Sequence, residues 1–207
     1  FTDHPAPSQK WLDQGGHDAL DPFVALGFVA AATTTIRLIP NIVVLPYRNP
    51  FVVAKAAATL DVLSGGRFTL ATGVGYPEAE FAALGVDHAE RASLFDEALD
   101  VLIGVWTTDD VSFTGRHFEA SGITAHPRPL ATPHPPIWVG GSSPAAIRRA
   151  ARRGDGWLPQ GPFAPEVVDR LRTELVAAGR EGEAFDVGAL AGPIYVGDPD
   201  WDVGRCL

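Results

Sequence analysis

Short apolar runs that alternate with helix-like segments form the main pattern along this chain of 207 residues. Such runs are typical of strands buried on both faces, as in a parallel sheet. The longest run, IRLIPNIVVL, contains Pro40, which is awkward in a strand because proline cannot donate a hydrogen bond to a neighbouring strand. We predict strands at residues 36–45, 67–72, 137–139, 156–158 and 189–196.

Helical spacing of apolar residues is clearest at residues 90–106, where Leu, Phe, Ile and Trp side chains recur on one face. Pro50 and the pair Gly65-Gly66 are the start and stop signals of another helix, at residues 51–63. Further helices are predicted at residues 145–153 and 165–178, and a small hairpin at residues 111–119.

The alternation of strands and helices, joined by short Gly and Pro turns, predicts an α/β fold with a parallel sheet in a single domain. The five strands leave two architectures open. An eight-stranded (β/α)₈ barrel has about 250 residues, so such a barrel would be incomplete at both ends here. A doubly wound sheet needs only five or six strands. Periodicity alone does not choose between them.

Composition narrows the functional classes. The chain carries 16 Lys and Arg against 25 Asp and Glu, a formal charge of −9, which disfavours binding to nucleic acid. A single cysteine, Cys206, excludes an internal disulfide and a cysteine zinc site, and we predict no metal site. No apolar run reaches the roughly 18 residues of a membrane span, so we expect a cytoplasmic protein with no membrane partner. Methionine is absent, so we expect a trimmed chain or a fragment.

In parallel α/β folds the catalytic and binding residues lie at the carboxyl ends of strands. Two groups of polar residues at such positions are candidates for a functional site. Asp3 and His4 open the chain, and histidine exchanges protons near neutral pH. A loop histidine without a role fits the same residues. Asn41, next to Ile42, lies late in an apolar run, where its amide needs a hydrogen-bond partner. Asn41 faces either a cleft or a structural partner in the core.

Two glycine loops also follow predicted strands. Gly73 and Gly75 would let a flat ligand approach the backbone, although a plain tight turn fits equally well. Gly140, Gly141 and Ser142 lead from a strand into a helix, so free N–H groups and the helix dipole favour a phosphate there. Alternatively, a serine of this loop serves only to cap the helix.

Three blocks of the sequence resemble the luciferase-like monooxygenase superfamily. They are residues 37–77, the run RASLFDEALDVLIGVW and the run PPIWVGGSSPAAIRRAARRGDGWLP. The chain is most similar to the branch of oxidoreductases, common in actinobacteria, that depend on coenzyme F-420, a deazaflavin. The resemblance implies a (β/α)₈ TIM barrel of the bacterial luciferase-like type, with the hairpin at residues 111–119 as an insertion. Residues 1–207 would then run from the end of strand 2 to strand 7, as a fragment of a protein of about 280–300 residues.

The resemblance also implies roles for individual residues. Asp3 and His4 match a pair that lies against the deazaflavin ring in relatives, with the histidine as proton donor or acceptor. A cis peptide that buttresses the ring matches Asn41–Ile42. The family's phosphate loop matches Gly140, Gly141 and Ser142. Relatives that oxidise sugar phosphates carry a catalytic glutamate where this chain has Tyr76, which leaves the substrate open.

The leading hypothesis is therefore an oxidoreductase that transfers a hydride between coenzyme F-420 and a small organic substrate, with His4 moving a proton. The alternative is an FMN-dependent monooxygenase of the same superfamily that uses O₂. A second alternative is a non-catalytic flavin-binding barrel. Relatives are usually dimers, which implies a homodimer.

Overall fold

Five short parallel strands form the central sheet of the computed structural model, which describes residues 1–161 and 164–189. The order across the sheet follows the order along the chain: β1 (Val43–Val44), β2 (Leu70–Gly73), β5 (Ile137–Gly140), β6 (Gly156–Leu158) and β7 (Asp186–Val187). Every neighbouring pair is parallel. Within the described residues the sheet is open, with β1 and β7 at its edges. The predicted α/β fold with a parallel sheet is confirmed.

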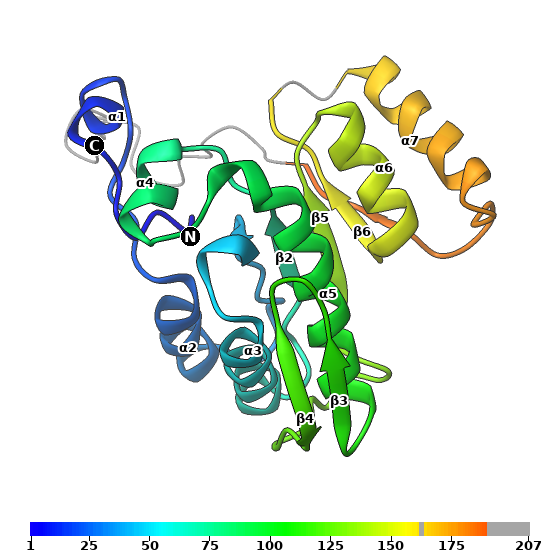
Figure 1. Ribbon diagram of the computed structural model, residues 1–207. Helices are drawn as coiled ribbons and strands as arrows, with labels where there is room; N and C mark the ends of the chain where they lie inside the picture. Colours follow the sequence, from blue (N-terminus) through cyan, green and yellow to red (C-terminus); the bar gives the residue numbers. More distant parts are fainter. Residues whose placement is uncertain (162–163, 190–207) are drawn as a thin grey trace.

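Helices connect the strands and cover one face of the sheet (Figure 1). Figure 1 shows α5 in front of β2, with α2 and α3 on one side of it and α6 and α7 on the other. The helices are α1 (Gln9–Asp13), α2 (Pro22–Ala32), α3 (Pro50–Ser64), α4 (Glu78–Ala83), α5 (Arg91–Thr107), α6 (Pro144–Arg153) and α7 (Pro165–Ala177), with short 3₁₀ turns η1 (Leu45–Tyr47) and η2 (His88–Glu90).

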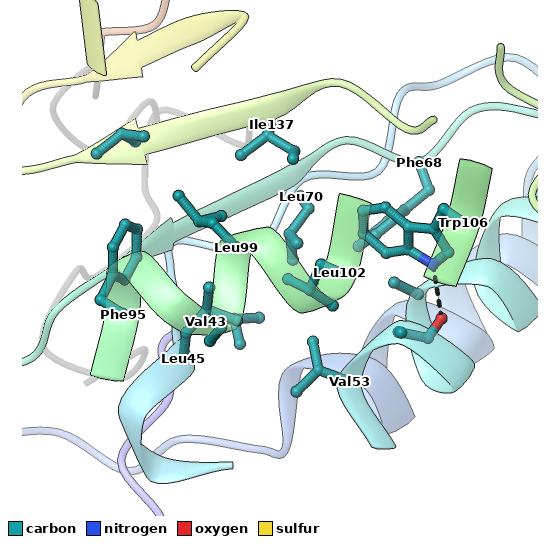
Figure 2. Close-up of a cluster of buried hydrophobic side chains, with 14 of the residues drawn as sticks. Val43, Leu45, Val53, Phe68, Leu70, Phe95, Leu99, Leu102, Trp106 and Ile137 are labelled. Atoms are coloured by element: carbon teal, nitrogen blue, oxygen red, sulfur yellow. Dashed lines mark hydrogen bonds between the residues drawn. The ribbon is translucent and has the colours of Figure 1, made fainter. Parts of the chain in front are cut away.

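The main hydrophobic core lies between this face of the sheet and the helices (Figure 2). Leu70 of β2 and Ile137 of β5 point toward Leu99 and Leu102 of α5, and all four side chains are fully buried. The indole N–H of Trp106 donates to a backbone oxygen of α3, at 3.0 Å, so this large side chain is buried without losing its hydrogen bond.

The opposite face of the sheet is buried as well. Ala71, Trp138 and Leu158 form a second apolar layer, against which Ile39 and Ile42 pack. Since neighbouring residues of a strand point to opposite faces, both faces need apolar side chains, and this explains the unbroken apolar runs in the sequence.

The signals at the ends of α3 act as the sequence predicted. The Asn49 side chain accepts a hydrogen bond from the N–H of Phe51, and Pro50 occupies the first turn. Gly65 ends the helix in the left-handed conformation, at φ 71°. The predicted helices at residues 90–106, 145–153 and 165–178 are likewise confirmed, to within two residues at each end.

Several boundaries were wrong. The strand predicted at residues 36–45 is reduced to Val43–Val44 and one bridge between Leu38 and Phe68, because Pro40 interrupts the pairing. The strand predicted at residues 67–72 begins later, at Leu70. Of the strand predicted at 189–196, Ala189 belongs to no strand and the rest lies outside the described residues. Helix α2 was not predicted, since its sequence has no polar face to give a period.

The hairpin extends further than predicted. Strand β3 (Val111–Thr114) pairs antiparallel with β4 (Glu119–Ile123), beyond the expected end at residue 119. Glu97 of α5 fixes its turn, because the carboxylate accepts hydrogen bonds from the backbone N–H groups of Arg116, His117 and Phe118, at 2.7–3.0 Å. Burial raises the pKa of Glu97, but these bonds outweigh it and lower the pKa below the usual value.

Candidate active site

A cavity of about 480 Å³ lies at the carboxyl ends of β1, β2 and β5, the edge where parallel α/β folds place their ligands. It brings together all nine residues that the sequence singled out. The cavity is lined by Thr2, Asp3, His4, His17, Asn41, Ile42, Val44, Gly73, Val74, Gly75, Tyr76, Pro77, Gly140, Gly141, Ser142, Ser143, Ala146 and Gln160. Their contacts with a cofactor or substrate stay predictions.

The side chain of Ile42 forms the floor of this cavity. A β-carbon built on Gly73 would stand 2.3 Å from Cδ1 of Ile42, and one on Gly140 would stand 3.0 Å from the same atom. The interpretation that Gly73 lets a ligand approach the backbone is therefore incomplete, because Ile42 fills that space. The peptide bond between Asn41 and Ile42 is cis, as the resemblance implied, and the Asn41 N–H donates to the Phe1 oxygen at 2.7 Å.

His4 is held by a buried carboxylate that the sequence did not reveal. Its Nδ1 lies 3.0 Å from Oε2 of Glu80, a residue of α4 with no exposed surface. The Tyr47 hydroxyl donates to the same oxygen at 2.9 Å. Burial raises the pKa of Tyr47 above its usual range, and the hydrogen bond and charge of Glu80 raise it further. Tyr47 therefore stays protonated and serves as a donor.

Aromatic rings surround His4 on its other sides. The ring centroids of Trp11 and His17 lie 4.5 and 5.9 Å from that of His4, and that of Tyr76 lies 6.2 Å away. The Trp11 indole N–H donates to the Tyr76 hydroxyl at 3.2 Å. This hydrogen bond joins helix α1 to the loop after β2 beside His4.

Asp3 is committed to its own neighbours. Its carboxylate accepts a hydrogen bond from the Val44 N–H at 3.0 Å and two from the Arg48 guanidinium, at 2.6 and 3.0 Å. Burial lowers the pKa of Arg48, but Asp3 and Asp21 raise it above the usual range. Asp3, 3% exposed, therefore fixes β1 and η1 beside the cavity, whatever it contacts in addition.

The loop formed by Gly140, Gly141 and Ser142 makes some hydrogen bonds within the protein and leaves other donors open to an anion. The N–H of Gly141 donates to the Leu158 oxygen at 3.0 Å, and the Ser142 hydroxyl donates to the Gln160 oxygen at 2.6 Å. Ser143 caps α6 by accepting from the Ala146 N–H. The backbone N–H groups of Ser142 and Ser143 have no acceptor among the described residues, so these two groups and the helix N-terminus are available to an anion.

The donor set fits a flat cofactor that ends in a phosphate. The cavity has the size of a cofactor site, an apolar floor for a ring, a histidine at one side and anion-binding N–H groups at the other. In the described part of the chain there is no group of three or more His, Cys, Asp or Glu side chains suited to a metal ion. The same part contains no helix long and apolar enough to cross a membrane.

Sequence reasoning missed Glu80, Tyr47 and Arg48. No periodic signal distinguishes Glu80 from Glu78 two residues earlier, although the side chain of Glu78 is 82% exposed and that of Glu80 is fully buried. A helix turns by about 100° per residue, so these two glutamates point in nearly opposite directions. Only the packing of α4 shows which of the two meets His4.

Comparison with known proteins gives consistent matches. The family model for luciferase-like monooxygenases matches residues 4–204. The chain is 35% identical, over 78% of its length, to the FMNH(2)-dependent dimethylsulfone monooxygenase of Pseudomonas putida. It is 32% identical, over 88% of its length, to the F420-dependent hydroxymycolic acid dehydrogenase of Mycobacterium tuberculosis. The chain spans about half the length of these relatives, 45% and 50% respectively.

Solved structures show the same fold. The crystal structure of monooxygenase RslO1 from Streptomyces bottropensis superposes with a TM-score of 0.72 at 28% identity, covering 81% of this chain and 53% of that one. An F420-dependent secondary alcohol dehydrogenase in complex with an F420-acetone adduct superposes with a TM-score of 0.73 at 22% identity, covering 83% of this chain and 54% of that one. The fold is thus of the luciferase-like TIM-barrel type.

Proposed function

The chain belongs to the luciferase-like monooxygenase family, and from this premise we propose that it is an oxidoreductase transferring a hydride between coenzyme F-420 and a small organic substrate. One observation carries the proposal: a single cavity joins His4, the apolar floor at Ile42 and the anion-binding loop before α6. The 32% identity to an F420-dependent dehydrogenase supports the deazaflavin. When bound, that cofactor supplies the hydride chemistry.

The residues of the chain divide the remaining work. The side chain of Ile42 supports the ring from below, and the N–H groups of Ser142 and Ser143 bind a phosphate. Trp11 and Tyr76, joined by a hydrogen bond, pack beside the His4 ring. With Nδ1 engaged by Glu80, Nε2 of His4 is the ring nitrogen left to give a proton to the substrate oxygen or to take one from it.

FMN is the alternative cofactor, and one observation favours it. The relative with 35% identity is an FMNH(2)-dependent monooxygenase, and both cofactors carry a ring and a phosphate that suit this cavity. In that case the protein would be a monooxygenase that consumes O₂.

Turnover assays separate the two cofactors. The purified protein is mixed with oxidised coenzyme F-420 and a panel of small alcohols, and loss of deazaflavin absorbance is followed while an electrode records O₂. We expect absorbance loss without O₂ uptake. Uptake of O₂ with reduced FMN beyond that of a protein-free control, together with no change in the deazaflavin, would overturn the proposal in favour of the monooxygenase.

We further propose that the protein is a homodimer in the cytoplasm, with α2 and α3 at the interface. Val24 and Phe28 of α2 and Val52 of α3 are 63%, 78% and 66% exposed, and the two helices pack side by side. Adjacent exposed apolar side chains are typical of a protein interface. Sedimentation should give a dimer for the wild type and a monomer for Phe28→Glu. A monomeric wild type contradicts this interface.

A further inference from the structure

We propose that Glu80 is a positioning residue that fixes the tautomer of His4, so that Nδ1 carries a proton and Nε2 presents a lone pair to the substrate. The inference rests on the proposed function for its consequence in catalysis. The hydrogen bond between His4 and Glu80 that supports this inference requires no bound cofactor. The sequence offered no sign of this pair, because the two residues are 76 positions apart.

The hydrogen bonds at Oε2 of Glu80 determine which nitrogen of His4 carries the proton. Two groups lie within hydrogen-bond distance of this oxygen: the Tyr47 hydroxyl at 2.9 Å and Nδ1 of His4 at 3.0 Å. An ionised carboxylate only accepts hydrogen bonds, so both neighbours must donate. Tyr47 donates its hydroxyl proton, and His4 donates from a protonated Nδ1. Neutral imidazole carries one ring proton, and Nε2 is then an acceptor.

Nε2 of His4 has no hydrogen-bond partner within residues 1–161 and 164–189 that would compete with Glu80 for the imidazole. In the described part of the chain, no side chain or backbone group forms a hydrogen bond with Nε2 of His4. The ring centroids of Trp11, His17 and Tyr76 lie within 6.2 Å of the His4 ring centroid, but these residues form no hydrogen bond with the His4 ring nitrogens. Asp3, the preceding residue in the chain, has its carboxylate occupied by Arg48 and the Val44 N–H. Among the described residues, Glu80 is therefore the only group that forms a hydrogen bond with the His4 imidazole.

The hydrogen bond between His4 and Glu80 is shielded from solvent. The His4 side chain is 11% exposed and Glu80 is fully buried, so water competes little for their hydrogen bond. Oε1 of Glu80 has no partner among the described residues. A buried carboxylate that is only half satisfied costs stability, and such a cost is common where a charge serves a reaction. When Nε2 takes a proton from a substrate, the ring becomes a cation beside this carboxylate, which stabilises it.

The test reads the tautomer directly in the ligand-free protein. Two-bond ¹⁵N–¹H spectra of histidine-labelled protein distinguish a protonated Nδ1 from a protonated Nε2, and the His4 signals are assigned by their loss in His4→Asn. We expect the Nδ1-protonated form at neutral pH in the wild type. In the double variant Glu80→Leu with Tyr47→Phe, which leaves no phenol without a partner, we expect the Nε2-protonated form.

Three further variants separate positioning from folding. Tyr47→Phe alone keeps the bond from His4 to Glu80, so its tautomer should match the wild type. Glu78→Gln, on the exposed face of the same helix, should match the wild type in tautomer and turnover. Glu80→Gln keeps the shape and an oxygen acceptor but loses the charge. With folding confirmed by circular dichroism, its kcat should fall about 100-fold with KM within a few-fold of the wild type.

The outcomes are decisive in each direction. An Nε2-protonated His4 in the wild type, or an unchanged tautomer in the double variant, overturns the proposal whatever the protein catalyses. If the wild type turns over with coenzyme F-420 and the double variant, with Nε2 of His4 protonated, keeps the wild-type kcat, the positioning role is also overturned, while the proposed function stands. Loss of the proposed function alone leaves the tautomer result intact, because those spectra require no cofactor.

Discussion

Ile42 occupies the space that a side chain at Gly73 would need. A β-carbon on Gly73 would lie 2.3 Å from Cδ1 of Ile42, whereas the next nearest atoms are 3.8 Å away. The clash thus comes from one methyl group. Glycine at position 73 is therefore required by the side chain of Ile42, which lines the cavity, and not by its own backbone conformation.

This contact predicts a paired effect. Gly73→Ala should displace the Ile42 side chain into the cavity and weaken cofactor binding at least tenfold, because the ring and the displaced methyl group compete for one space. Ile42→Val removes Cδ1 and should restore binding in the double variant Gly73→Ala with Ile42→Val. Fluorescence titration with coenzyme F-420 measures all four proteins, and their thermal unfolding serves as the control for folding.

Additive losses in that double variant would contradict the account, since they would show that Gly73 and Ile42 act independently.

His4 should matter for turnover and little for affinity. His4→Ala removes the proton donor and acceptor beside the cavity, so kcat should fall by about 100-fold or more while the cofactor Kd changes within a few-fold. Steady-state kinetics and a binding titration on the same preparation measure both quantities. Unchanged turnover would remove His4 from the mechanism.

Asp3 should contribute strongly to stability. Asp3→Asn removes the charge that pairs with Arg48 close to the buried Val44 N–H, and breaking such a pair costs about 3 kcal/mol. Urea denaturation measures the change in the free energy of unfolding. Asp169→Asn is the matched control, because its pair with Arg172 is exposed and is worth less than about 0.5 kcal/mol. Equal losses in the two variants would refute the structural role of Asp3.

Glu97 gives a pH-dependent prediction. Its pKa is lowered from the ordinary value of 4.5 in the folded protein, so its contribution is complete above that pH and is lost as pH falls through the folded pKa. Glu97→Gln should therefore cost about 1 kcal/mol near pH 7, through a lost hydrogen bond to the hairpin turn. The difference between wild type and variant should shrink below pH 4.5. A difference that grows with acidification would be evidence against this role.

The sequence predicted those parts of the fold whose signals are local. Pro50 and Gly65 mark the ends of α3, and the apolar period of α5 shows which of its faces is buried. Helix α2 was not predicted because every face of it is apolar and shows no helical period, although Asp21 caps it and Pro22 starts it. The first strand was predicted too long, because a run of β-branched residues hides the interruption at Pro40.

The candidate site was predictable as a place but not as a set of contacts. Gly73 and Gly140 come together because they end β2 and β5 at the same edge of the sheet, and His4, which belongs to no strand, lines the same cavity. The partner of His4 was not predictable. Glu80 lies on the short helix α4, whose own Phe81 packs against Val44 and Tyr47, and no local pattern encodes the orientation of this helix.

The most direct measurement for the central claim is a fluorescence titration of the purified protein with coenzyme F-420 and, separately, with FMN. We predict saturable binding of the deazaflavin, a markedly weaker response to FMN, and deazaflavin binding that is at least tenfold weaker in Gly73→Ala. Preference for FMN would contradict the deazaflavin and favour the oxygen-using monooxygenase. Binding of neither would contradict both enzyme assignments and favour a non-catalytic barrel.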